Sequence, residues 1–204
     1  MVKASIIGAT GYAGQELIRL LYNHSDVDII HLVSHSYSGK KLSDIYPGFN
    51  KLIDDKLVDK SAADLASSCD VMFFALPHGL TASQISEELL EKVKIIDLGA
   101  DFRLKDKNTY ENWYKVKHPT SQFIEEAVYG LSELNREKVK KARIVANPGC
   151  YTTCSITSLA PLVDNKLIDL SSIIIDAKSG VSGAGRSLNL PTHFPESNES
   201  FKAY

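Results

Sequence analysis

Cys150 is the residue of this chain best placed for covalent chemistry. It follows the apolar run Ile144–Ala146 and an Asn-Pro-Gly turn at residues 147–149, and it begins a stretch with helical spacing. Amide N–H groups and the positive dipole end at a helix start stabilise a thiolate. The same N–H groups can hold an oxyanion that develops during acyl transfer. A buried strand, a tight turn and then a cysteine therefore predict a nucleophile.

A glycine motif at Gly8, Gly11 and Gly14 follows a short apolar run at residues 4–7 and opens a helical pattern. Glycine allows a tight turn and a close approach of backbone to a pyrophosphate, and a helix N-terminus offers amide donors to phosphate oxygens. The spacing is GxxGxxG instead of the commoner GxGxxG, but a first strand–helix junction is the context that a dinucleotide site requires. The predicted cofactor contacts here are Gly8, Ala9, Thr10, Gly11, Tyr12, Ala13 and Gly14.

The residues after the second predicted strand, Val27–Val33, indicate which dinucleotide binds. An NAD site usually places a carboxylate at this strand end. Here the strand is followed by hydroxyl groups and cations, which suit a 2′-phosphate. The prediction is NADP, with contacts from Ser34, His35, Ser36 and Lys40. Lys41 fits equally well as a solvated loop residue.

A third strand end, at Leu76, Pro77 and His78, is predicted to lie near the nicotinamide end of the cofactor, because the carboxyl ends of the strands line the ligand crevice. His78 is a candidate base, although a loop histidine is more often structural. A dinucleotide site combined with a cysteine nucleophile indicates a covalent, nicotinamide-dependent enzyme that acts on an aldehyde or acyl phosphate.

The elements that position these motifs alternate along the chain. Apolar runs predict strands at residues 4–7, 27–33, 71–76, 93–98 and 144–146. Helical spacing occurs at residues 14–23, 61–67, 83–90, 105–117 and 134–141. Strands without polar alternation, separated by helices, predict a parallel sheet covered on both faces. The predicted fold class is α/β, a Rossmann-type doubly wound parallel sheet followed by the start of a second α+β domain.

The second unit begins near Cys150. We expect a helix over residues 150–163 that Pro161 bends or ends, a strand at residues 173–177 and an irregular glycine-rich loop at residues 179–186. The predicted domains are an NADP-binding domain at 1–149 and an incomplete catalytic and dimerisation domain at 150–204. Because residues 150–204 are few for an independent core, we expect the chain to be part of a longer protein.

Composition narrows the class of partner. A net charge of −2, with 24% charged and 44% hydrophobic residues, provides no electrostatic footprint for nucleic acid or an anionic membrane. No apolar run is long enough to cross a bilayer, and no signal-peptide pattern is present. The cysteines Cys69, Cys150 and Cys154 lack a disulfide framework and zinc-ligand spacing. We therefore expect a cytoplasmic protein without a metal, and a buried Cys154.

Six blocks occur in an order that closely resembles the N-acetyl-gamma-glutamyl-phosphate reductases, within the aspartate-semialdehyde dehydrogenase superfamily. They lie at residues 8–14, 76–79, 97–103, 129–133, 147–151 and 177–186. The resemblance spans essentially the whole chain. The Asn-Pro-Gly-Cys-Tyr block together with the Asp-Phe-Arg block is fairly specific for these reductases over their aspartyl relatives.

The resemblance implies NADPH-dependent reductive dephosphorylation of N-acetyl-glutamyl 5-phosphate, a small-molecule acyl phosphate, through a Cys150 thioester, in arginine biosynthesis. It implies cofactor contacts from Ser182 and Gly183, and it places Arg103, Asn147 and Arg186 at the substrate. A guanidinium fork suits phosphate oxygens, although an ion pair with Asp101 is an equal alternative for Arg103.

The chain departs from the family pattern in three places. Thr152 stands where the family usually has proline, and Cys154 stands where it has a small apolar residue. The family's catalytic histidine belongs to a segment expected beyond Tyr204, and nothing around His193 matches it. The resemblance also implies a homo-oligomer, a dimer or a tetramer, in the full-length form.

Three other functions are compared with this hypothesis. An aspartate-semialdehyde dehydrogenase would use the same mechanism on a different acyl group. A non-catalytic NADP-binding module would bind cofactor without turnover. An epimerase or reductase that uses a Tyr-x-x-x-Lys pair is rejected, because the corresponding pairs are Tyr110 with Tyr114 and Tyr114 with His118.

Overall fold

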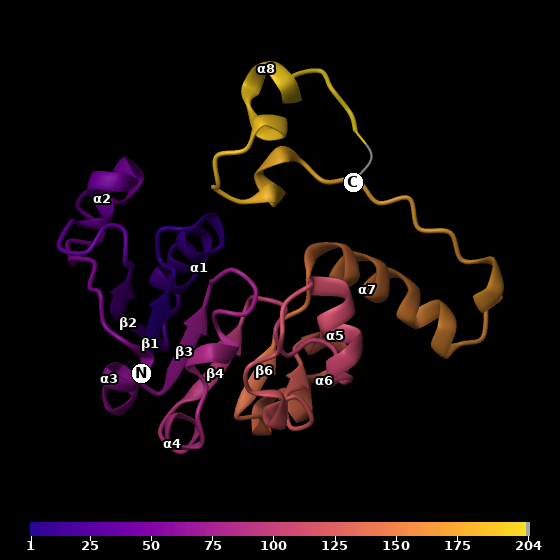
Figure 1. The fold of residues 1–204 in the computed structure, drawn as a ribbon, viewed down its shortest axis with the longest axis horizontal. Coiled ribbons are helices and arrows are strands. Elements are labelled where there is room, and N and C mark those ends of the chain that lie inside the picture. The colour runs from indigo at the N-terminus through magenta and orange to yellow at the C-terminus, as the bar shows by residue number, and fades with distance from the viewer. Residues whose placement is uncertain (203–204) are drawn as a thin grey trace.

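The computed structural model describes residues 1–202, and its centre is a six-stranded parallel sheet (Figure 1). The strands follow the order β2-β1-β3-β4-β6-β5, and every neighbouring pair is parallel. Their bounds are β1 Val2–Ile7, β2 Val27–Val33, β3 Val71–Phe74, β4 Lys94–Asp97, β5 Val128–Tyr129 and β6 Ile144–Ala146. The strand order reverses between β1 and β3, which is where ligands bind in open sheets of this kind. The predicted doubly wound α/β class is confirmed.

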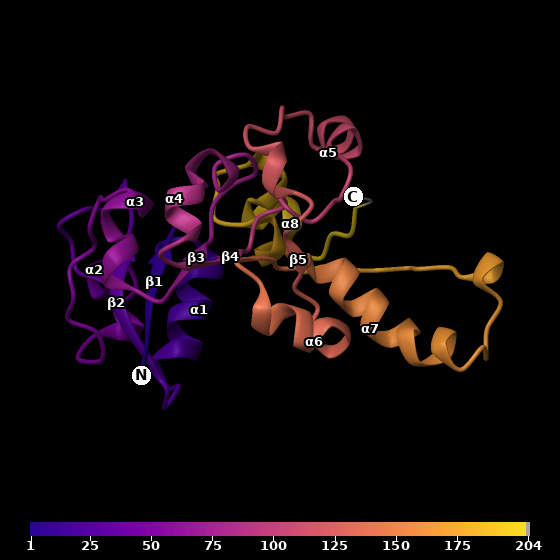
Figure 2. The same ribbon diagram turned by 90° about the horizontal axis from the view of Figure 1, so that it is seen from below.

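Helices cover both faces of this sheet. They are α1 Tyr12–Tyr22, α2 Leu42–Ile45, α3 Ala62–Leu65, α4 Glu87–Leu90, α5 Lys107–Tyr114, α6 Ser132–Lys141, α7 Cys150–Asp164 and α8 Phe194–Ser197. Figure 2 shows α1 and α6 on one side of the strands and α3 and α4 on the other. Successive side chains of β1 point to opposite faces, so buried Ile6 packs in the core with α1, and buried Ile7 packs in the core with α3 and α4.

Three predicted elements differ from the structure. The helix expected at residues 83–90 is broken at Ile85 and Ser86, which have extended backbone, because the Ser86 side chain caps the start of α4. Pro161 does not end α7, since Asn165 closes the helix through its bonds to the Pro161 carbonyl. The prediction of a strand at residues 173–177 is wrong. This segment is irregular and pairs with no other segment in the described part of the chain.

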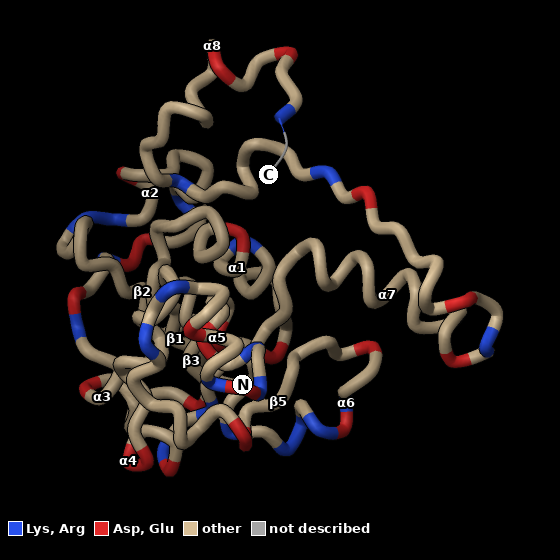
Figure 3. Tube along the Cα trace, turned by 45° about the vertical axis from the view of Figure 1, so that its right-hand side comes forward, with Lys and Arg blue, Asp and Glu red and all other residues tan. Residues whose placement is uncertain are grey.

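The second unit extends away from the sheet along α7 (Figures 1 and 2). No residue of α7 is fully buried, and Asp164 is its single charged residue, so Figure 3 shows almost no charge along this helix. Ile174 beyond it is 91% exposed. A helix with a single charged residue and no fully buried one, followed by exposed aliphatic residues, is the kind of surface at which proteins associate. The last two residues of the predicted second domain, 203 and 204, lie outside the described residues.

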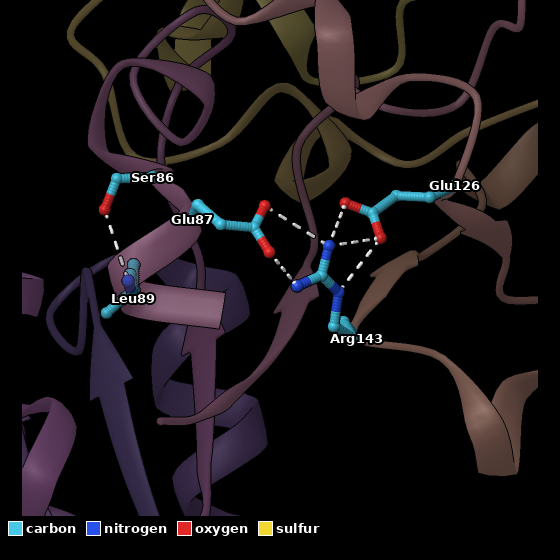
Figure 4. A network of polar contacts seen from close by, with 5 residues as sticks. All are labelled: Ser86, Glu87, Leu89, Glu126 and Arg143. Atoms are coloured by element: carbon cyan, nitrogen blue, oxygen red, sulfur yellow. Dashed lines mark hydrogen bonds and ion pairs between the residues drawn. The ribbon is translucent and has the colours of Figure 1, made fainter. Parts of the chain in front are cut away.

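Arg143 joins two carboxylates where β6 begins (Figure 4). Its Nε lies 3.0 Å and its Nη2 lies 2.8 Å from Glu126 Oε2, and its Nη1 donates to Glu87 at the start of α4. The hydrogen bonds that the guanidinium donates, to Glu87 first and then to Glu126, raise its pKa. The network links α4 to the segment before β5.

We expect Arg143→Gln to lower the free energy of unfolding of the gene product by about 1 kcal/mol, because a bidentate network contributes more than an isolated pair. The control is Arg19→Gln, which removes one exposed pair with Glu16 on α1 and should cost clearly less, because solvent screens such a pair. Urea unfolding measures both. Equal losses in the two variants would show that the Arg143 network adds nothing to stability.

Candidate active site

The glycine loop is held by two close backbone approaches. Gly8 has φ of +86°, and a Cβ built on it would lie 2.3 Å from the carbonyl oxygen of Ala75 after β3. A Cβ on Gly14 would lie 2.3 Å from the carbonyl oxygen of Gly8. The amides of Tyr12, Ala13 and Gly14 begin α1 and have no partner within the helix. This loop has the shape and the free donors that fit a dinucleotide phosphate.

The loop is also hydrogen-bonded to the connection that follows β2. Thr10 Oγ1 lies 2.9 Å from Ser34 Oγ, and the Ser34 side chain is buried. The Tyr46 hydroxyl donates to the Thr10 carbonyl oxygen at 2.8 Å. Hydroxyl groups from two segments therefore meet at the carboxyl end of β2, where this fold places the adenosine ribose.

The predicted cations near this strand end are not equivalent. His35 Nδ1 lies 2.8 Å from Asp59 Oδ2, and Lys41 Nζ lies 2.9 Å from Asp54 Oδ1. Lys40 Nζ instead lies 5.7 Å from the centroid of the Tyr37 ring. Sequence reasoning found no carboxylate directly after β2, but the backbone pairing of Val33 with Val58 brings Asp59 back to it. Ser36 is exposed in the same connection.

The turn after β3 carries Leu76, Pro77 and His78. Leu76 packs against the core, whereas the other two side chains are exposed. The His78 ring lies 4.9 Å from the Tyr114 ring, measured between centroids. Contact with α5 therefore holds this histidine at the carboxyl edge of the sheet, next to the glycine loop.

Asp101 connects this turn to α5, whereas the sequence suggested it only as a possible ion-pair partner of Arg103. Its buried carboxylate accepts hydrogen bonds from the Gly79 amide at 2.7 Å, the Ala82 amide at 2.9 Å and the Tyr110 hydroxyl at 2.9 Å. Burial, followed by the bond to Asp101, raises the pKa of Tyr110. No ion pair joins Asp101 to Arg103 within residues 1–202, so the structure does not support that alternative for Arg103.

Arg103 instead holds the turn that precedes the cysteine. Its Nε donates to the Asn147 carbonyl oxygen at 2.7 Å, and its Nη2 donates to the Leu98 carbonyl oxygen at 2.8 Å. Its Nη1 lies 3.2 Å from the position of a Cβ on Gly149 and has no hydrogen-bond partner among the described residues. One edge of the guanidinium is therefore fixed to backbone, and Nη1 remains available for an anion beside Cys150.

Cys150 is the first residue of α7, and it is exposed. Thr152 Oγ1 donates to the Gly149 carbonyl oxygen at 2.9 Å, and the Tyr129 hydroxyl donates to Thr152 Oγ1 at 3.2 Å. The turn is thereby linked to the edge strand β5. Neither Thr152 nor Tyr129 was singled out as a contact from the sequence, because their bond crosses between separate elements.

The other two cysteines differ in burial. Cys69 is buried, and burial raises its pKa. Cys154 is exposed, so the prediction that it is buried is wrong. The reason is that α7 extends from the sheet and buries none of its residues in the described chain. No group of three or more possible metal ligands lies together in residues 1–202.

Asp97 is a buried carboxyl group at the end of β4. Its Oδ1 accepts from the Gly99 amide at 2.9 Å, while Oδ2 has no hydrogen bond of ordinary geometry among the described residues. Burial raises the pKa of Asp97 to about 6, and interaction with the Thr81 hydroxyl opposes this shift. The Asp97 carbonyl oxygen accepts the Asn147 amide at 2.8 Å, so this residue also supports the cysteine turn.

Asp97→Asn is expected to stabilise the gene product at pH 7.5 by about 2 kcal/mol and to leave its stability at pH 4 unchanged. Between pH 4 and 6 the folded state binds more protons at Asp97 than the unfolded state does, so wild-type stability from this group falls as the pH rises. An amide keeps the Gly99 bond without an ionisable group. Urea unfolding across this range measures the effect, and parallel pH profiles for variant and wild type would contradict it.

Arg186, which follows the glycine-rich loop, contacts the nucleotide unit. Arg186 Nη1 donates to the Thr10 carbonyl oxygen at 2.9 Å and to the Tyr46 hydroxyl at 3.1 Å. Ser182 and Gly183 form a short 3₁₀ turn, whose backbone bonds are local. Arg186 thus contacts the glycine loop and the connection after β2 instead of the residues around Cys150. No helix in the described chain has the length and apolar character that a membrane span needs.

Comparisons with known proteins agree with this arrangement. Residues 3–142 match the family "Semialdehyde dehydrogenase, NAD binding domain", and residues 150–204 match "Semialdehyde dehydrogenase, dimerisation domain". An N-acetyl-gamma-glutamyl-phosphate reductase from Lachnospira eligens is 56% identical over 205 residues, covering 100% of this chain and 59% of that protein. The chain therefore spans about 59% of the length of this and of a second curated relative with the same name.

Solved structures share the fold. Aspartate semialdehyde dehydrogenase II from Vibrio cholerae has a TM-score of 0.58 at 19% identity, covering 91% of this chain and 48% of that one. The aspartate semialdehyde dehydrogenase with NADP from Candida albicans has a TM-score of 0.55 at 21% identity, covering 81% and 47%. The chain belongs to the semialdehyde dehydrogenase family, with an NAD(P)-binding domain followed by the start of a dimerisation domain.

Proposed function

We propose that the protein containing this chain reduces N-acetyl-L-glutamyl 5-phosphate to N-acetyl-L-glutamate 5-semialdehyde with NADPH, a step of arginine biosynthesis. The observation that carries the proposal is the position of Cys150: an exposed thiol directly after β6, at the same edge of the sheet as the glycine loop after β1. A cysteine and a dinucleotide site on one edge suit covalent capture of an acyl group followed by its reduction. Relatives that are 51–56% identical carry the reductase name.

In the first step the Cys150 thiolate attacks the acyl carbon of the acyl phosphate. The carbon–sulfur bond forms, the carbon–oxygen bond to phosphate breaks, and phosphate leaves with a proton from solvent. The free Nη1 of Arg103 beside Gly149 is placed to bind the phosphate oxygens. The backbone bonds of Arg103 keep the Asn-Pro-Gly turn in position while the leaving group departs.

In the second step the carbon–sulfur bond of the thioester breaks, giving the aldehyde and restoring the thiolate of Cys150. Bound NADPH supplies the hydride that reduces the thioester carbon. The glycine loop and the His78 turn position the cofactor, and Asp101 fixes the His78 turn through Gly79 and Ala82. Asn147 holds the turn together through its carbonyl oxygen and its amide.

The proposal also includes NADP as the cofactor, with Ser34, Ser36, His35 and Lys40 near its ribose, and a homo-oligomer in the cytoplasm. A match to a dimerisation domain supports self-association, as does α7, which has one charged residue and no fully buried residue. We propose that the nucleotide domain comprises residues 1–149 and that the second domain starts at Cys150.

The test is phosphate-dependent reduction of NADP⁺ by the longest gene product that contains this chain. N-acetyl-glutamate 5-semialdehyde should be a substrate, and aspartate semialdehyde should react at least about a hundredfold more slowly. The reason is that polar groups of the site that hydrogen-bond the acylated amine would have no partner when aspartate semialdehyde is bound. The opposite preference would make the protein an aspartate-semialdehyde dehydrogenase. If NADP⁺ binds but neither aldehyde is turned over, the protein is a non-catalytic NADP-binding module.

A further inference from the structure

Arg186 is fixed in place at the end of β2 although its side chain is exposed. Besides its hydrogen bonds to the Thr10 carbonyl oxygen and the Tyr46 hydroxyl, its guanidinium carbon lies 5.1 Å from the Tyr46 ring centroid and 5.6 Å from the Tyr37 ring centroid. Both distances are within the range of cation–π attraction. Four contacts from three residues therefore orient one guanidinium.

A second cation shares one of these rings. Lys40 Nζ lies 5.7 Å from the Tyr37 ring centroid. Neither Lys40 nor Arg186 forms an ion pair with a carboxylate within residues 1–202, whereas His35 and Lys41 in the same connection pair with Asp59 and Asp54. Two cations on one ring without a counter-charge repel each other, so an anion that binds between them gains energy from both.

The donors that remain on Arg186 fit a phosphate group. Nη1 is used by Thr10 and Tyr46, while Nε and Nη2 have no hydrogen-bond partner in the described chain. The N–H groups of Nε and Nη2 form the fork that binds phosphate oxygens bidentately. The same Thr10 also contacts the buried Ser34 hydroxyl, at the strand end where the adenosine ribose lies in this fold.

We therefore propose that Arg186 and Lys40 form the binding site for the ribose 2′-phosphate of NADP, so that a loop of the second unit determines the choice of cofactor. This places Arg186 at the cofactor, not at the substrate as the resemblance implies. The inference rests on the proposed use of NADP. The glycine-rich sequence before Arg186 lets this loop reach across to the nucleotide unit.

The experiment measures dissociation constants of the gene product for NADP⁺, NAD⁺, 2′,5′-ADP and 5′-ADP by calorimetry. Arg186→Gln should weaken binding of NADP⁺ and 2′,5′-ADP by at least about thirtyfold and change binding of NAD⁺ and 5′-ADP by less than about threefold. Lys40→Gln should weaken binding of the two 2′-phosphorylated ligands by about fivefold. The matched control Lys41→Gln, whose cation pairs with Asp54, should change all four constants by less than about twofold.

Inorganic phosphate is the probe for a general anion site. The proposal predicts no competition with 2′,5′-ADP below millimolar phosphate, because the nucleotide supplies the remaining contacts. Strong competition at lower concentration would assign the two cations to free phosphate and overturn the inference.

The outcomes separate this inference from the proposed function. A wild-type protein that binds NAD⁺ as tightly as NADP⁺ contradicts the proposed cofactor. A wild-type preference for NADP⁺ that Arg186→Gln retains contradicts the role of Arg186 alone. Equal weakening of NADP⁺ and NAD⁺ by Arg186→Gln would show that Arg186 only supports the Thr10 carbonyl group, and would also overturn the inference.

Discussion

Replacing Cys150 with serine is expected to lower the rate of phosphate-dependent NADP⁺ reduction by at least about a thousandfold, with NADP⁺ affinity unchanged within about twofold. A serine hydroxyl is a much weaker nucleophile than a cysteine thiolate, because its pKa is far higher, so it cannot form the acyl intermediate efficiently. The phosphate and ribose contacts that we propose for NADP lie on the glycine loop and the connection after β2, two segments that hydrogen-bond to each other and do not include Cys150. Initial rates and calorimetric titration measure the two quantities.

The matched control is Cys154→Ser, because Cys154 is equally an exposed thiol on α7, one helical turn further along. It should retain activity within about threefold, since nothing in the proposed chemistry uses it. A Cys150→Ser variant as active as the Cys154→Ser variant would eliminate covalent catalysis by Cys150.

Gly8→Ala is expected to destabilise the gene product by at least about 3 kcal/mol and to abolish tight cofactor binding. Gly8 has φ of +86°, and its new Cβ would lie 2.3 Å from the Ala75 carbonyl oxygen. A backbone atom cannot move away as a flexible side chain can, so β1 or β3 must shift. The same movement displaces the amides at the start of α1, which begin four residues later.

Gly39→Ala separates the two causes, because Gly39 also has a positive φ, of +82°, but has nothing within 4 Å of the new Cβ. It should therefore show the conformational cost alone, about 1 kcal/mol. Urea unfolding of both variants measures the difference. Similar losses for Gly8→Ala and Gly39→Ala would show that the close approach to Ala75 has no energetic weight.

The sheet could be predicted because each of its longer strands is recognisable from residues that are adjacent in the sequence. Short, mainly apolar segments predicted strands at Val27–Val33 and Ile144–Ala146 with the bounds that the structure has. The place of Gly8 after a strand predicted a tight turn. The two-residue strand β5 has no detectable period. Residues 173–177 have strand composition, but composition does not provide the neighbouring strand with which a strand must pair.

The candidate site was predictable where a motif is continuous and not where contacts join distant segments. Cys150 and the turn before it are adjacent in sequence, and the structure places the thiol at the start of α7 as expected. The Asp101 carboxylate accepts hydrogen bonds from Gly79, Ala82 and Tyr110, which belong to different segments. The pairing of His35 with Asp59 likewise depends on how the connection after β2 returns. Side-chain partners of this kind follow from the fold.

The most direct test of a Cys150 thioester is mass spectrometry of the gene product after reaction with N-acetyl-glutamate 5-semialdehyde and NADP⁺ in the absence of phosphate. Oxidation should then stop at the acyl-enzyme, because the phosphate that would release it is missing. We predict an N-acetylglutamyl adduct on the peptide that contains Cys150, formed with one equivalent of NADPH and lost when phosphate is added. An active protein that forms no adduct, or forms it on the peptide of Cys69 alone, would contradict the mechanism.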